Sequence, residues 1–197
     1  MRGLATWPRR ELYLWLGSNK VFGFALRQGE QKMVLKHASV FGLLVAFSVL
    51  FGGAAQAATV IALGASNTFG KGVSPGQTYP AQLEVLLRAK GLNVNVINAG
   101  INGDTTGGML ARLDGVVPKG TNVVILQPGG NDRRKGTPDQ TSEILTKLHS
   151  MGVKVVLLSN NMFRGLPHQP DGVHLTPEGY RKLAEKLAGQ VAGALRH

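Results

Sequence analysis

Three side chains in this sequence could together attack an acyl group. Ser66 follows a short apolar run, and His174 lies near the end of the chain with Asp171 three residues before it. A serine hydroxyl is a weak nucleophile at its ordinary pKa and needs a neighbouring base. An imidazole can accept the hydroxyl proton, and a carboxylate can orient that imidazole. Ser66, His174 and Asp171 are therefore candidates for nucleophile, base and orienting acid.

Two further polar segments offer the hydrogen-bond donors that such chemistry needs. Residues 98–106 contain Gly103, and residues 127–132 contain Asn131. The tetrahedral intermediate of acyl transfer carries an oxyanion, which fixed donors in a dry site stabilise. The backbone N–H groups of Ser66 and Gly103 and the side-chain amide of Asn131 could supply three. This chemistry is complete without a cofactor or a metal ion.

The turn that carries Ser66 has two other interpretations. A phosphate-binding loop has four residues between its glycine and its Gly-Lys pair, followed by serine or threonine. Here five residues separate Gly64 from Gly70-Lys71, and Gly72 follows. An ordinary strand-to-helix turn with a surface serine also fits this stretch taken alone.

The histidines and the oxyanion segment have structural alternatives as well. His168, Asp171 and His174 are types that suit zinc, but their loop has no recognised ligand spacing. We interpret His168 as a residue at the rim of the pocket. Gly103 could be a plain turn residue, and we expect Asp104 to cap the helix that follows it.

The elements around these segments predict an α/β fold. Helical spacing and capping signals alternate with apolar runs, which predict strands at 59–63, 93–98, 121–126 and 153–159 and helices at 79–90, 105–117, 137–151 and 176–194. Such nearly apolar strands favour a parallel sheet covered on both faces. We expect a flavodoxin-like, doubly wound parallel sheet of about four strands with the first strand central. All four polar segments then follow strands at the carboxyl edge, where ligands bind in such sheets.

Two capping signals set the expected starts of helices in the second half of the chain. Thr137, Pro138 and Gln140 have the spacing of an N-cap, a first-turn proline and a capping-box glutamine. Thr176 and Pro177 give the last helix a similar start.

Composition narrows the possible functions. The absence of cysteine excludes disulfides, thiolate metal sites and a cysteine nucleophile. The formal net charge of +11 invites a nucleic-acid interpretation, but from Ala58 onward the chain has 15 Lys and Arg against nine Asp and Glu. The run Arg133-Arg134-Lys135 has no interleaved aromatic residues, so we expect no nucleic-acid partner. We interpret this run as a solvated loop rather than an anion-binding patch, and Arg164 as a solvated arginine rather than a contact for an acidic substrate.

The first part of the chain has the pattern of an export signal. Residues 33–57 combine a short basic start, an apolar core at 40–51 and the small residues Ala55 and Ala57 before a cleavage site. We expect cleavage before Ala58, no stable membrane span after processing, and a periplasmic or secreted product; an uncleaved anchor is the alternative. Residues 1–32 show no clear periodicity, and we interpret them as a possible misassigned extension before a start at Met33.

Taken together, the four polar segments resemble a known family. They read ALGASNT at 62–68, NAGINGDTT at 98–106, GGND at 129–132 and DGVHL at 171–175. In this order they are similar to the four signatures of the GDSL-type esterases, or SGNH hydrolases, and most nearly to their bacterial arylesterase and acyl-CoA thioesterase/lysophospholipase branch. The resemblance covers most of residues 59–193. It implies that Ser66 is the nucleophile, His174 the base, Asp171 its partner, and Gly103 and Asn131 oxyanion donors.

The sequence departs from that family pattern in two places. Ala65 stands where the family usually has aspartate, and only 39 residues separate Asn131 from Asp171. Family members usually fit a further strand and helix into this interval. We therefore expect the sheet to end at the fourth strand, the loop that carries His174 to leave directly from it, and the site to be shallow and open. The sequence does not decide whether His174 then reaches Ser66.

Together with the export-signal pattern, the resemblance implies a secreted serine esterase that hydrolyses a small-molecule ester or thioester through an acyl-enzyme. A carbohydrate O-acetyl esterase, and a non-catalytic binding module whose triad no longer assembles, remain alternatives. The natural substrate and the oligomeric state are not predicted.

Overall fold

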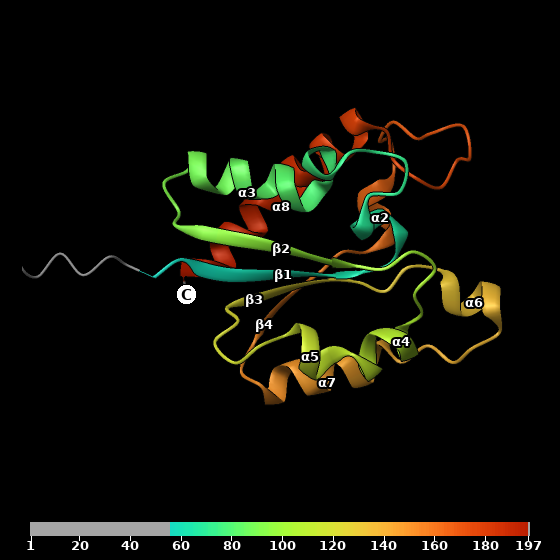
Figure 1. Cartoon of the computed structure of the whole chain (residues 1–197), viewed down its shortest axis with the longest axis horizontal. Coiled ribbons are helices and arrows are strands. Elements are labelled where there is room, and N and C mark those ends of the chain that lie inside the picture. Colours follow the sequence, from blue (N-terminus) through green and yellow to red (C-terminus); the bar gives the residue numbers. More distant parts are fainter. Residues whose placement is uncertain (1–55, 197) are drawn as a thin grey trace, which may run out of the picture. The chain divides into compact units, whose positions relative to one another are not determined.

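The computed structural model describes residues 56–196, which form a parallel sheet with helices on both faces (Figure 1). The strands follow the spatial order β2-β1-β3-β4, and all neighbouring pairs are parallel. They are β1 (Ala58–Gly64), β2 (Val94–Gly100), β3 (Val123–Gln127) and β4 (Lys154–Leu157). The predicted four-stranded α/β fold with a central first strand is therefore confirmed.

The sheet separates two layers of helices, the first containing α3 and α8 and the second α4, α5 and α7 (Figure 1). The α-helices are α2 (Ser66–Phe69), α3 (Tyr79–Ala89), α4 (Thr106–Ala111), α5 (Leu113–Val116), α6 (Asn131–Lys135), α7 (Thr141–Ser150) and α8 (Pro177–Arg196). Two short 3-10 helices, η1 (Pro75–Gln77) and η2 (Asn160–Phe163), lie in the connections. No helix in residues 56–196 combines the length and the apolar character needed to cross a membrane.

Strand β1 is apolar from Val60 to Leu63 because these residues contribute to both cores. Successive side chains of a strand point to opposite faces. Val60 and Ala62 pack in the core that also contains Leu83 of α3 and Leu187 of α8. Ile61 and its alternate neighbours pack in the second core, which contains residues of α4, α5 and α7. The four residues 60–63 are fully buried, which explains why the strand shows no polar alternation.

The strand register brings the polar segments to one edge. Gly64 at the end of β1 lies opposite Gly100 of β2 and Gln127 of β3. The three strands therefore end at the same level. The segments that follow them carry Ser66, Gly103 and Asn131, so these three residues start from neighbouring strand ends.

Three predictions about helices are wrong. The helix predicted over 105–117 is divided at Arg112 into α4 and α5, and the side chain that caps it belongs to Thr105, which accepts from Gly108 N–H at 3.1 Å. Asp104 is therefore not the cap. The helix predicted from 137 begins at Thr141, and α6 was not predicted at all.

Tertiary hydrogen bonds explain the late start of α7. The Thr137 hydroxyl donates to Asp132 at 3.1 Å instead of capping a helix. Gln140 N–H donates to the Thr106 hydroxyl at 2.8 Å. These contacts hold 137–140 in a non-helical connection, because they satisfy groups that a capping box would have used. The cap predicted at Thr176 is confirmed, since it accepts from Gly179 N–H at 3.2 Å.

The interval between Asn131 and Asp171 contains α6, α7, β4 and η2. The sheet of the described residues ends at β4, and the chain passes through η2 to the loop that carries His174, as expected. The predicted extension at 1–32 and almost all of the predicted signal peptide at 33–57 lie outside the described residues.

Candidate active site

Ser66 is the first residue of α2 and follows β1 through a very tight turn. A Cβ atom added to Gly64 would lie 2.2 Å from Thr68 Oγ1 and 2.9 Å from Gln127 Cβ, so a side chain does not fit there. Gln127 Oε1 accepts from Ala65 N–H and from Thr68 Oγ1, both at 3.1 Å. The turn is thus fixed from β3, and it leaves Ser66 with 8% of its surface exposed.

The structure brings Ser66, His174 and Asp171 into direct contact. His174 Nε2 lies 2.9 Å from Ser66 Oγ, and His174 Nδ1 lies 2.5 Å from Asp171 Oδ2. An ionised carboxylate can only accept, so Nδ1 carries the proton and Nε2 of the neutral ring accepts from the serine hydroxyl. The shortened interval before Asp171 therefore still allows His174 to reach Ser66.

Asp171 is kept ionised by its hydrogen bonds rather than by burial. The His174 side chain donates to one carboxylate oxygen, and the backbone N–H groups of His174 and Val173 donate to the other, each at 2.9 Å. These three bonds hold the pKa of Asp171 well below its ordinary value, and the bond from the His174 side chain is the largest cause. A permanent negative charge thus faces the imidazole, as stabilising an imidazolium requires.

Neutral side chains position the loop that carries His174. Gln169 Nε2 donates to Lys71 O at 2.8 Å and to Leu175 O at 2.7 Å. Asn67 Nδ2 donates to Val173 O at 3.1 Å, and its Oδ1 accepts from the Tyr180 hydroxyl at 3.1 Å. Burial raises the pKa of Tyr180 to about 12, so the hydroxyl remains a donor at neutral pH. The sequence analysis missed these residues because no local pattern marks them.

Asn131 begins α6, and its amide has a fixed orientation. Its Nδ2 donates to Asp104 O at 2.6 Å, while Arg134 Nη2 donates to its Oδ1. Oxygen and nitrogen of the amide are thereby distinguished by their partners. Asn131 is 4% exposed and lines the same cavity as Ser66. Within residues 56–196, the second N–H of its amide has no hydrogen-bond partner.

Gly103 lies in the turn beside Asn131 but does not line that cavity. Its φ of 72° is in the left-handed region, which favours glycine. Lys135 Nζ donates to its carbonyl at 2.7 Å. Its N–H has no partner within residues 56–196. The structure therefore leaves this donor available without placing it in the cavity.

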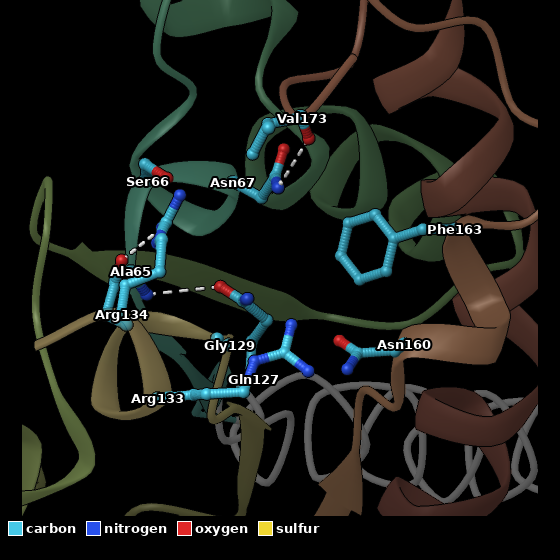
Figure 2. A pocket seen from close by; sticks show the side chains of 12 residues that line it. Ala65, Ser66, Asn67, Gln127, Gly129, Arg133, Arg134, Asn160, Phe163 and Val173 are labelled. Carbon is cyan, nitrogen blue, oxygen red and sulfur yellow. Dashed lines mark hydrogen bonds between the residues drawn. The ribbon is translucent and has the colours of Figure 1, made fainter. Parts of the chain in front are cut away.

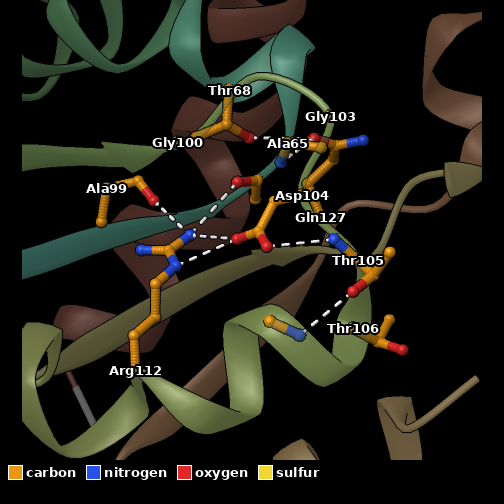
Figure 3. Close-up of polar contacts among 12 residues, drawn as sticks. Ala65, Thr68, Ala99, Gly100, Gly103, Asp104, Thr105, Thr106, Arg112 and Gln127 are labelled. Atoms are coloured by element: carbon orange, nitrogen blue, oxygen red, sulfur yellow. Dashed lines mark hydrogen bonds and ion pairs between the residues drawn. The ribbon is translucent and has the colours of Figure 1, made fainter. Parts of the chain in front are cut away.

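A largely buried ion pair holds the turn that contains Gly103 (Figure 3). Arg112 donates to Asp104 Oδ2 from Nε at 3.0 Å and from Nη2 at 2.8 Å, and from Nη2 to Ala99 O at 2.8 Å. The same nitrogen lies 3.4 Å from Gly64 O. Arg112 thus ties the ends of β1 and β2 to the segment after β2. The eight-residue separation of the pair carries no sequence signal.

The cavity beside Ser66 has a volume of about 270 Å³ and a polar lining (Figure 2). Its other lining residues are Ala65, Asn67, Gln127, Gly129, Gly130, Asn131, Arg133, Arg134, Asn160, Phe163 and Val173. The basic run at 133–135 is exposed but belongs to α6, so it is not a loop. No aspartate or glutamate lines the cavity.

The other candidates from the sequence lie outside this cavity. His168 is exposed and does not line it, contrary to the prediction, and its Nδ1 lies 2.7 Å from Leu166 O. Arg164 is exposed and does not line it either. In residues 56–196, no three histidine or acidic side chains are grouped so that they could hold a metal ion.

A parallel α/β sheet with a serine, a histidine and an aspartate in contact at its carboxyl edge is the architecture of one class of hydrolase folds. The chain belongs to the GDSL-like lipase/acylhydrolase family, whose model matches residues 62–171. His174 comes three residues after this match ends. The resemblance inferred from the four polar segments is thus confirmed.

Known proteins similar to this chain carry esterase names. It is 34% identical over 110 residues to esterase TesA of Pseudomonas aeruginosa, covering 53% of this chain and 55% of that protein. It is 31% identical over 121 residues to an arylesterase of Vibrio mimicus, covering 58% and 60%. A crystal structure of TesA matches with a TM-score of 0.60 and 25% identity, over 70% of this chain and 99% of that one. The chain thus aligns with little more than half the length of these sequence relatives.

Proposed function

We propose that this protein hydrolyses carboxylic esters or thioesters through an acyl-enzyme on Ser66. The observation that carries the proposal is the pair of contacts made by His174, 2.9 Å to Ser66 Oγ and 2.5 Å to Asp171. Nucleophile, base and orienting carboxylate are the parts that acyl transfer requires. The esterase and arylesterase names of the relatives support the same reaction class.

In the proposed reaction, Ser66 Oγ attacks the carbonyl carbon and its proton passes to His174 Nε2. The oxyanion that forms is stabilised by N–H donors of Ser66, Gly103 and Asn131. The intermediate then collapses, the bond to the alcohol or thiol breaks, and that group leaves with the proton from His174. Water attacks the acyl group on Ser66 by the same steps, and the carboxylic acid is released.

The test is hydrolysis of para-nitrophenyl acetate and butyrate by the full chain and by Ser66→Ala. We expect the substitution to remove nearly all turnover while the circular dichroism spectrum is unchanged. A fluorophosphonate probe should label the parent protein at Ser66 and leave the variant unlabelled. Turnover that persists in a folded Ser66→Ala variant would refute the proposal. A binding module without catalysis receives no support from the His174 contacts, and it predicts a folded protein that the probe does not label.

We also propose that the hydrolase domain is residues 58–197 and that it acts in the periplasm or outside the cell. Support comes from the export-signal pattern at 33–57 in the sequence. Mass spectrometry of protein recovered from the periplasm should find a new N-terminus at Ala58. Recovery of an uncleaved chain in the membrane fraction would contradict this proposal.

A further inference from the structure

We propose that the substrate carries an anionic group, a carboxylate or a phosphate, which Arg133 and Arg134 bind while Ser66 attacks its ester or thioester bond. This inference rests on the proposed function, and it names the substrate class of the same site. It revives the anion-binding interpretation of the basic run, which the sequence alone does not favour.

The first argument is position. Arg133 and Arg134 line the cavity that Ser66 and Asn131 also line. In Figure 2 the side chain of Arg134 extends toward Ser66, and the guanidinium of Arg133 lies between Gln127 and Asn160. Two positive charges therefore stand where a substrate held at Ser66 would extend. No acidic side chain lines this cavity to offset these charges, so the lining favours an anion.

The second argument is that neither arginine has an acidic partner within residues 56–196, whereas three other arginines do. Arg88 pairs with Glu84 at 3.0 Å and Arg112 with Asp104 at 2.8 Å, and Arg181 pairs with an acidic residue of its own helix. Within residues 56–196, the Arg133 side chain forms no hydrogen bond and no ion pair.

The nearest acidic residues along the chain are already satisfied by other donors. Asp132 is buried and accepts from Thr106 N–H and from the hydroxyls of Thr106 and Thr137, at 3.0–3.2 Å. Asp139 shares an adjoining hollow with Arg133, but its carboxylate accepts from Thr141 N–H and Oγ1 at 2.9 and 2.5 Å. No ion pair joins either carboxylate to Arg133 in the described part of the chain.

The chemistry of guanidinium favours an oxyanion as the occupant. Its planar fork donates two parallel hydrogen bonds to a carboxylate or a phosphate. Both arginines are exposed, so their attraction is screened by water and salt, and we expect an advantage of about tenfold rather than more. Arg134 also donates to Asn131 Oδ1, so it influences a proposed oxyanion donor as well. Arg133 has no such contact and gives the cleaner test.

The experiment compares matched esters that differ in charge. One pair is para-acetoxybenzoate and the neutral para-acetoxybenzamide, which place the charge on the leaving group. The second pair is para-nitrophenyl hydrogen adipate and para-nitrophenyl hexanoate, which place it on the acyl group. Acetoxyphenyl phosphate replaces the carboxylate with a phosphate. Each is measured with the full chain, Arg133→Gln, Arg134→Gln and the control Arg164→Gln, which removes a positive charge outside the cavity.

We expect kcat/KM to be about tenfold higher for the charged member of at least one pair. Arg133→Gln should remove most of this advantage, because it should lower kcat/KM for the charged ester several-fold more than for its neutral partner, and Arg164→Gln should retain the advantage. Arg134→Gln should lower kcat/KM for both esters of a pair, and it should lower the value for the charged ester more. The advantage should shrink as salt is added, because exposed charges are screened. The inference would be overturned if the charged esters, the phosphate included, had the same kcat/KM as the neutral esters. It would also be overturned if Arg133→Gln lowered kcat/KM equally for the charged and the neutral ester of a pair.

Failure of the proposed function would show itself differently. If no ester is turned over, or if Ser66→Ala retains turnover, the proposed reaction is wrong whatever the arginines do. In that case, anion binding is measured directly by nuclear magnetic resonance titrations with the anion para-hydroxybenzoate and the neutral para-hydroxybenzamide. Binding of the anion alone that Arg133→Gln abolishes supports the arginine site, whereas absence of binding refutes it.

Discussion

The loop that carries His174 and the short helix α6 lie at the same edge of the sheet but are held in opposite ways. The loop is held by the amides of its own Gln169 and of Asn67 in α2, which bond to backbone carbonyls and to the Tyr180 hydroxyl, and His174 itself is 7% exposed. In α6, burial and charge change after the second residue. Asn131 and its neighbour 132 are buried and bonded, whereas residues 133–135 are exposed and positive.

We relate this difference to two tasks, which are the reaction itself and the binding of the substrate. Groups that must meet within hydrogen-bond distance are fixed by several neutral bonds, because misplacement weakens proton transfer. Charged side chains bind a substrate more tightly if they have no partner in the free protein, because an internal partner would compete with the ligand. On this view α6 joins both tasks, its first residue acting on the reacting carbonyl and its last turn on the remainder of the substrate.

The largest effect should come from the His174 loop. Asp171→Asn leaves the shape intact but removes the charge that orients the imidazole, so kcat should fall by about a thousandfold or more. Glu178→Gln is the matched control, since Glu178 is also an exposed carboxylate whose pKa is lowered, in its case by Lys182. Stopped assays with para-nitrophenyl butyrate would measure both. Loss of less than about tenfold in Asp171→Asn would show that the charge of Asp171 is not required for the reaction.

The next effect should come from the buried end of α6. Asn131→Ala removes a proposed oxyanion donor and should lower kcat by about a hundredfold or more. Asn160→Ala is its control, because Asn160 lines the same cavity and its side chain forms no hydrogen bond within residues 56–196. If the two variants lose activity equally, the amide of Asn131 has no special part in the reaction, and the division within α6 fails.

The strands and the common edge of the polar segments were predictable because they depend on local patterns. Runs such as 60–63 are apolar on both faces, and that signal survives in any fold with a buried parallel sheet. Parallel strands then place their carboxyl ends together by topology alone. The types of residue in the four segments were enough to nominate Ser66, His174 and Asn131.

The features that were predicted wrongly or left open depend on contacts between distant residues. The division of the helix at Arg112 follows from an ion pair and from carbonyls at the ends of β1 and β2. The late start of α7 follows from Thr106 and Asp132, which belong to other segments. Whether His174 meets Ser66 depends on how 39 residues fold between Asn131 and Asp171, and spacing alone does not determine that.

A smaller effect on activity, but a clear one on stability, should come from the ion pair beneath Gly103. The side chains of Arg112 and Asp104 are only 19% and 10% exposed, so Arg112→Gln leaves a buried carboxylate unpaired. We expect the free energy of unfolding to fall by about 3 kcal/mol. Lys147→Gln breaks an exposed pair with Asp114, whose side chains are 37% and 75% exposed, and should cost less than about 1 kcal/mol.

Urea unfolding of Arg112→Gln, Asp104→Asn and the double variant would complete that comparison. If the pair acts as a unit, the double variant should be less destabilised than the sum of the single ones. Additive losses would mean that Arg112 stabilises the strand ends through the carbonyls alone.

The smallest effect is the pH dependence of stability from Asp171. Its pKa is lower in the folded protein than in the unfolded chain, where it is about 3.9. The folded state therefore binds fewer protons in this range, so the stabilisation is present above about pH 4 and is lost as the pH falls through the folded pKa.

Asp171→Asn should accordingly lower the urea midpoint at pH 6 and bring it closer to that of the parent protein at pH 3. In a His174→Gln background this pH-dependent difference should shrink, because the side-chain bond from His174 is the largest cause of the lowered pKa. It should not vanish, since the backbone N–H groups of residues 173 and 174 still donate to the carboxylate. A difference that stays constant from pH 6 to pH 3 would mean that the loop is held by its neutral amides alone, and that the charge of Asp171 serves only the imidazole.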